Sequence, residues 1–153
     1  MKISLFILMA TLLCVLLIVT GVGVSRAEQG NEPIGRFITI KGVKLHYVIA
    51  GEGPGIVLVH GASSNLREFS SSILPILAKS HRVIAFDRPG YGFSERPSEE
   101  KAWLNPAQVA ALLLDASEAL GMQKPLLVGH SWAGSVVMSA MVFMPERIAG
   151  GVL

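Results

Sequence analysis

Ser131 is the residue of this chain best suited to nucleophilic chemistry. It stands in the stretch GHSWAG at 129–134, directly after the apolar residues 126–128. A serine on a tight turn between a buried strand and a helix projects its hydroxyl at the positive end of that helix. Such a turn brings backbone segments close together, so small residues are needed two positions before and two after the serine. Gly129 and Ala133 meet that requirement, although a serine that merely caps a helix would also fit the pattern.

The G-x-S-x-G pattern of nucleophile-bearing turns is met with one departure. Its fifth position is Ala133, and a glycine follows one residue later, at Gly134. Alanine is the next smallest residue, so the steric requirement still holds. His130 adjoins the serine and its side chain should point away, which predicts a structural role and not that of the general base.

A serine nucleophile also needs backbone N–H donors for the negative oxygen that develops during acyl transfer. One donor is expected from Trp132, immediately after the serine. The second is expected from Ala62, in the loop after the first buried strand, where Gly61 lets the backbone turn inward. His60 is expected to pack or hydrogen-bond beneath this loop, which makes it a structural residue.

The elements that would position these loops follow from the apolar patterns. Two alternating runs predict a hairpin, at 36–40 and 44–50. Four apolar runs predict further strands, at 56–60, 82–86, 125–128 and 148–153. Three segments have helical spacing, at 66–79, 105–120 and 131–144. This alternation predicts an α/β fold, a mostly parallel sheet with helices on both faces, whose strand-end loops meet at one edge.

At this point the chain resembles the α/β-hydrolase fold superfamily. The matching segments are IVLVHGAS at 56–63, RVIAFDRPGYGFS at 82–94, LLVGHSWAG at 126–134 and MPERIAGGVL at 144–153. The second segment is similar to the family's D-x-x-G-x-G-x-S loop. In this superfamily dehalogenases and epoxide hydrolases carry aspartate at the nucleophile position. Serine there is typical of esterases, lipases, carbon–carbon hydrolases and perhydrolase-like members.

The resemblance implies a hydrolase of ester or similar acyl bonds in small molecules, acting through an acyl-enzyme on Ser131 and without cofactor or metal. It also implies an acid and then a histidine after the nucleophile, but only Glu146 is acidic there and no histidine follows. We therefore expect the N-terminal portion of a truncated α/β-hydrolase domain, nearly inactive by itself. Two alternatives stay open: an inactive fragment or membrane-associated binding module, and a perhydrolase- or haloperoxidase-like relative.

Several other polar residues are expected to be structural. His46 and His81 are expected at surface positions on strand edges. Asp87 suits a hydrogen bond that shapes its loop, and Asp115 falls inside a helix away from the strand ends. The Trp132 indole could form a pocket wall.

The N-terminal residues differ in character from the rest. No charged residue occurs between residues 3 and 24, which predicts a membrane anchor or, alternatively, a cleaved signal peptide over 1–26. Residues 27–35 are expected to form a linker and residues 36–153 the hydrolase portion. The hydrolase portion is expected outside the cytoplasm. It would be membrane-bound if the N-terminal segment is an anchor, and secreted or periplasmic if that segment is cleaved.

The formal net charge of +2 comes without a basic cluster, which argues against nucleic acid binding. Cys14 is the only cysteine, so no intrachain disulfide can form.

Overall fold

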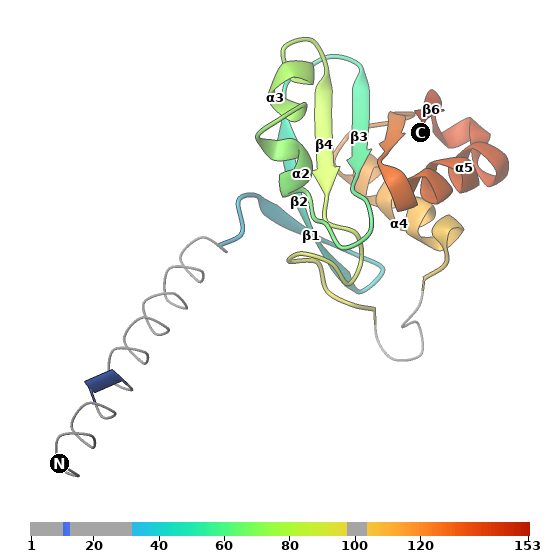
Figure 1. Cartoon of the computed structure of the whole chain (residues 1–153). Coiled ribbons are helices and arrows are strands. Elements are labelled where there is room, and N and C mark those ends of the chain that lie inside the picture. Colours follow the sequence, from blue (N-terminus) through green and yellow to red (C-terminus); the bar gives the residue numbers. More distant parts are fainter. Residues whose placement is uncertain (1–10, 13–31, 98–103) are drawn as a thin grey trace, which may run out of the picture. The chain divides into compact units, whose positions relative to one another are not determined.

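A computed structural model describes residues 11–12, 32–97 and 104–153 (Figure 1). The chain divides into two units, residues 1–33 and 34–153. The expected anchor or signal and most of the expected linker lie outside the described residues, apart from a short helical piece at Thr11 and Leu12. Within the described ranges, no helix combines the length and apolar character needed to span a membrane.

The second unit is built on a six-stranded sheet with the order β1-β2-β4-β3-β5-β6. Its strands are β1 (Arg36–Ile40), β2 (Val43–Ala50), β3 (Gly55–Val59), β4 (Arg82–Phe86), β5 (Leu126–Gly129) and β6 (Gly150–Val152). The β1–β2 and β2–β4 pairs are antiparallel, and the pairs from β4 through β6 are parallel. The carboxyl ends of β3, β4 and β5 therefore meet at one edge of the sheet (Figure 1).

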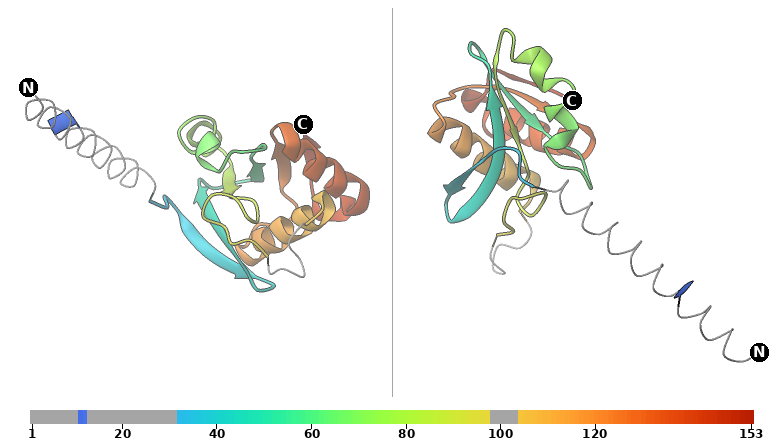
Figure 2. Two further views of the ribbon diagram at one scale, coloured as in Figure 1. Left: turned by 60° about the horizontal axis from the view of Figure 1, so that its bottom comes forward. Right: turned by 90° about the vertical axis from the view of Figure 1, so that its left-hand side faces the viewer.

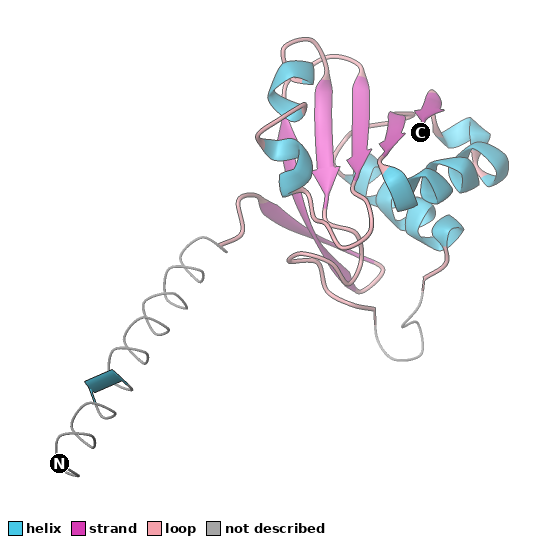
Figure 3. Ribbon diagram, viewed as in Figure 1, coloured by secondary structure: helices cyan, strands magenta, loops and turns pink. Residues whose placement is uncertain are grey.

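Helices cover both faces of this sheet (Figures 2 and 3). They are α2 (Arg67–Ser70), α3 (Leu74–Leu77), α4 (Pro106–Ala119) and α5 (Gly134–Phe143), with 3₁₀ turns η2 (Ser131–Ala133) and η3 (Pro145–Arg147). Alternate residues of β3 point to opposite faces of the sheet and pack into two separate cores. Val57 and Val59 join the core beneath α4 and α5, whereas Ile56 and Leu58 join the core beneath α2 and α3. The expected α/β sheet with apolar strands buried on both faces is confirmed.

The helix expected over 66–79 is in fact two short pieces, α2 and α3. Ser72 Oγ donates to the Glu68 carbonyl over 2.7 Å, which is the serine back-bonding that weakens helices. Pro75 lacks the N–H that a continuous helix would require. By contrast, α4 begins where expected, because Asn105 and Gln108 form a reciprocal capping box over 2.9 Å in each direction.

Candidate functional site

Ser131 lies at the carboxyl end of β5, on a sharp turn into η2 and α5. Its φ is +54°, a left-handed conformation that costs free energy in a residue with a Cβ. The same turn brings the backbone of β5 against the helical turn that follows. A Cβ on Gly129 would lie 2.6 Å from the Ala133 carbonyl oxygen, so only glycine fits at that position.

The departure from the G-x-S-x-G pattern has a simple steric basis. Ala133 is fully buried, and its small side chain is accommodated in the core beneath α5. Gly134 is helical, and a Cβ there would contact only Leu153 Cδ2, at 3.7 Å. The turn therefore requires glycine at position 129, two residues before the serine. It does not require glycine at position 133 or 134.

The loop after β3 lies directly against the turn of Ser131. A Cβ on Gly61 would be 3.3 Å from the Ser131 Cβ and 3.2 Å from His130 Nδ1. The structure thus brings together the two loops that the sequence predicts to form one site. Among the described residues, no hydrogen-bond acceptor is found for the backbone N–H of Ala62 or of Trp132.

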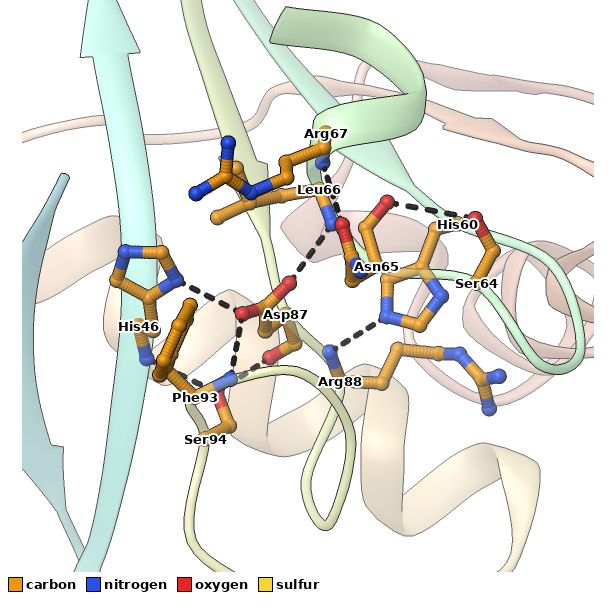
Figure 4. Close-up of polar contacts among 10 residues, drawn as sticks. All are labelled: His46, His60, Ser64, Asn65, Leu66, Arg67, Asp87, Arg88, Phe93 and Ser94. Atoms are coloured by element: carbon orange, nitrogen blue, oxygen red, sulfur yellow. Dashed lines mark hydrogen bonds and ion pairs between the residues drawn. The ribbon is translucent and has the colours of Figure 1, made fainter. Parts of the chain in front are cut away.

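His60 supports this loop from below. Its ring is completely buried, with Nδ1 2.9 Å from the Gly61 carbonyl oxygen. Its Nε2 accepts from the Arg88 backbone N–H over 3.0 Å (Figure 4). One ring nitrogen must donate and the other must accept, so this arrangement requires neutral imidazole. Burial also favours the neutral ring, because desolvation lowers the pKa of His60 below its ordinary value of 6.5.

Glu68 ties the same loop to the residue before the nucleophile. Its Oε1 lies 2.5 Å from His130 Nδ1, and its Oε2 accepts from the Gly61 N–H over 3.5 Å. The His130 ring is therefore directed at Glu68, although its side chain is 64% exposed. In the described part of the chain no hydrogen bond joins this ring to the Ser131 hydroxyl.

Arg88 lies at the candidate site, although no sequence pattern indicated it. It follows β4 and is only 2% exposed, and burial lowers the pKa of its guanidinium. Its Nη2 donates to the Gly61 carbonyl over 2.8 Å. The guanidinium carbon lies 4.1 Å from the ring centroid of Tyr91 and 4.2 Å from that of Trp132, so two aromatic rings flank the cation. The only sequence signal was an arginine two residues after a buried strand.

A pocket of about 280 Å³ opens beside the turn of Ser131. Its walls include Arg88, Tyr91, Arg96, Leu104, Val109 and Trp132. Trp132 therefore forms part of a pocket wall, as its position in the sequence indicates. Mixed apolar and cationic walls suit a small organic molecule with a polar group.

Asp87 organises the loop that follows β4. Its carboxylate accepts from the N–H of Leu66 over 2.7 Å, from the N–H of Phe93 over 2.8 Å and from His46 Nδ1 over 2.7 Å (Figure 4). The expected surface position of His46 is wrong, because this ring is 1% exposed and is covered by Phe93 and Phe37. Asp87 has the loop-shaping contacts expected of it.

The remaining candidates stay away from the nucleophile. His81 hydrogen-bonds Ser80 Oγ at the opposite end of β4, and Asp115 on α4 pairs with Lys41 and Arg147. Among the described residues, no group of three histidine, cysteine, aspartate or glutamate side chains could hold a metal ion. The candidate site therefore comprises Ser131, the backbone N–H groups of Ala62 and Trp132, and the neighbouring pocket walled by Arg88 and Trp132.

Comparison with known proteins agrees with this architecture. A family model described as alpha/beta hydrolase fold matches residues 54–153. Bifunctional epoxide hydrolase 2 of Mus musculus is 31% identical over 119 residues, which cover 77% of this chain and 21% of the mouse protein. 2-Hydroxymuconate semialdehyde hydrolase of a Pseudomonas strain is 31% identical over 128 residues, covering 80% of this chain and 43% of the enzyme.

Solved structures show the same similarity. An epoxide hydrolase from Vigna radiata aligns with a TM-score of 0.68 and 27% identity, over 76% of this chain and 37% of that one. An N-acyl homoserine lactone degrading enzyme aligns with a TM-score of 0.67 and 27% identity, over 76% of this chain and 43% of that one. The chain thus spans less than half the length of each of these four proteins.

Proposed function

Because the chain belongs to the α/β-hydrolase fold family, we propose that the protein hydrolyses ester or similar acyl bonds of small molecules with Ser131 as nucleophile. The observation that carries this proposal is the φ of +54° at Ser131, in a turn packed against the Gly61 loop. Backbone strain of this kind is retained where the surrounding structure holds a reactive group in place.

The proposed reaction has two halves. The Ser131 Oγ attacks the acyl carbon, its proton passes to a general base, and the carbonyl oxygen takes up negative charge. The N–H groups of Ala62 and Trp132 would donate to that oxygen. Collapse breaks the bond to the leaving alcohol, which receives the proton, and leaves an acyl group on the serine. Water, activated by the same base, then releases the acid and restores the hydroxyl.

The identity of residue 131 separates this proposal from epoxide opening. Two of the four similar proteins are named as epoxide hydrolases, and that class carries aspartate as nucleophile in this fold. An aspartate carboxylate attacks directly, whereas a serine hydroxyl must lose a proton to a base. Ser131 therefore favours acyl chemistry, in line with the lactone-degrading enzyme among the structural relatives.

The general base is the part of this mechanism that the described residues do not supply. Each described histidine ring has another hydrogen-bond partner, in Asp87, Gly61, Ser80 or Glu68. We accordingly propose that the 153-residue chain alone turns over esters very slowly, because loss of the base removes several orders of magnitude from the rate. Rapid ester hydrolysis by the purified chain would contradict this.

The experiment that tests the nucleophile uses the complete protein. A fluorophosphonate probe should label it, and p-nitrophenyl esters of graded chain length should be hydrolysed. Ser131→Ala should abolish both signals, whereas Ser139→Ala, on the exposed side of α5, should leave both unchanged. Undiminished labelling of Ser131→Ala would show that the nucleophile lies elsewhere.

A further inference from the structure

Arg88 contacts both loops that carry the proposed oxyanion donors. We propose that Arg88 is a positioning residue that holds the Ala62 and Trp132 N–H groups in register, so that both reach the same developing oxyanion. This inference rests on the proposed acyl chemistry at Ser131. It assigns a function to a buried cation.

The first contact fixes the Gly61–Ala62 peptide. The Gly61 carbonyl oxygen is 2.8 Å from Arg88 Nη2 and 2.9 Å from His60 Nδ1. In a planar trans peptide the C=O and the following N–H point in opposite directions. Anchoring this carbonyl on Arg88 and His60 therefore turns the Ala62 N–H away from both, and leaves it free to donate elsewhere.

The second contact fixes Trp132, whose N–H is the other proposed donor. Its indole ring lies against the Arg88 guanidinium, at 4.2 Å from the ring centroid, and the ring of Tyr91 lies at 4.1 Å. Cation–π contacts of this kind favour a flat arrangement of guanidinium and ring. One planar group thus joins the loop after β3 to the turn after β5.

The burial of Arg88 is only partly compensated by its polar contacts. In the described part of the chain no carboxylate lies within ion-pair distance of its guanidinium, and its buried Nε has no hydrogen-bond partner. An uncompensated buried donor and a desolvated cation both destabilise a fold. The contacts that do compensate the cation are those with the Gly61 carbonyl and with the two aromatic rings, which are the same contacts that fix the two loops.

The main test is made in the same protein as the Ser131→Ala experiment. It compares two arginines that both bind backbone carbonyls, Arg82 at the start of β4 and Arg88 just after its end. Arg88→Met should lower kcat for ester hydrolysis and the fluorophosphonate labelling rate by roughly 10- to 100-fold, with a smaller change in KM. Arg88→Lys keeps the charge but loses the planar stack, so it should recover only part of the rate. Arg82→Met removes the bonds to Leu120 and Gly121 instead, and should leave kcat unchanged.

A spectroscopic measurement provides the second test. Trp103 and Trp132 are the only tryptophans of the 153-residue chain, so in that chain Trp103→Phe isolates the emission of Trp132. In that background Arg88→Met should change the intensity and the acrylamide quenching of Trp132, because the stacked cation is lost. Arg82→Met should change neither.

The outcomes separate this inference from the proposed function. If Ser131→Ala abolishes labelling while Arg88→Met and Arg88→Lys label like the wild type, Arg88 does not position the donors. If Ser131→Ala leaves labelling intact, the acyl chemistry itself fails. If Arg88→Met does not fold, Arg88→Lys and Tyr91→Leu still disturb the stack, and a wild-type kcat in both would overturn the inference.

Discussion

The Cα of Gly129 faces the carbonyl oxygen of Ala133 so closely that a Cβ on Gly129 would lie 2.6 Å from that oxygen. The carbonyl belongs to the backbone and cannot rotate away as a side chain could. We predict that Gly129→Ala lowers the free energy of unfolding by about 1–3 kcal/mol, because the turn must open to admit the methyl group. Urea denaturation followed by circular dichroism measures this change.

Gly134→Ala provides the matched control. It adds the same methyl group five residues later, where only Leu153 Cδ2 lies nearby, at 3.7 Å, and the backbone is helical. Alanine in a helix is favoured over glycine, so this variant should be as stable as the wild type or gain up to about 1 kcal/mol. Equal destabilisation by both substitutions would disprove the steric account of the turn.

Asp87 offers a prediction about the loop after β4. Its two carboxylate oxygens accept from Leu66 N, Phe93 N and His46 Nδ1. Asp87→Asn replaces one acceptor oxygen with an NH₂ group that faces a donor, so we predict a loss of about 1–3 kcal/mol in unfolding free energy. Asp115→Asn, which weakens a partly exposed ion pair with Lys41 and Arg147, should cost less than about 1 kcal/mol.

Much of the sheet was predictable, because strands buried on both faces are apolar at every position. The run 82–86 matches β4 residue for residue, and 56–60 is displaced from β3 by a single position. The helix over 66–79 was not correctly predicted, since its apolar spacing persists across Ser72 and Pro75, where local hydrogen bonding and a missing N–H interrupt the backbone.

The site was only partly predictable. Ser131, Gly61 and Gly129 were identifiable because their roles depend on a local turn. Arg88 and His46 were not, because their partners are distant in sequence: Gly61 is 27 residues from Arg88, and Asp87 is 41 residues from His46. The alternation of β2 places His46 opposite the inward Leu45 and Tyr47, and its ring is buried because Phe37 of β1 and Phe93 of the loop after β4 cover it.

The buried neutral His60 makes stability depend on pH. The folded state holds its pKa below 6.5, whereas the unfolded chain protonates near that value, so the unfolded state binds more protons as pH falls. This contribution is complete above the unfolded pKa and is lost as pH drops toward the folded pKa. We predict that the unfolding free energy, measured by urea denaturation, decreases as pH falls below about 6.5.

Two histidine variants isolate this effect. His60→Gln should be less stable at neutral pH, because Gln loses the buried ring that packs edge-on against Tyr91. Its stability should fall less with acidification, because Gln does not titrate. His81→Gln, which loses only a bond to Ser80, should retain the wild-type pH dependence. An unchanged slope in His60→Gln would assign the pH dependence to another group.

Six exposed apolar side chains belong to α5, to β6 and to the residue after β6. They are Met138, Met141, Val142, Phe143, Val152 and Leu153. Several exposed apolar side chains on neighbouring elements favour association more than single exposed ones do. We predict that the purified chain self-associates in sedimentation velocity, and that Val142→Lys with Phe143→Glu reduces this association. Ile76→Lys, which alters a single exposed residue of α3, should leave it unchanged. Equal effects of the two changes would show that general hydrophobicity, and not these six side chains, drives the association.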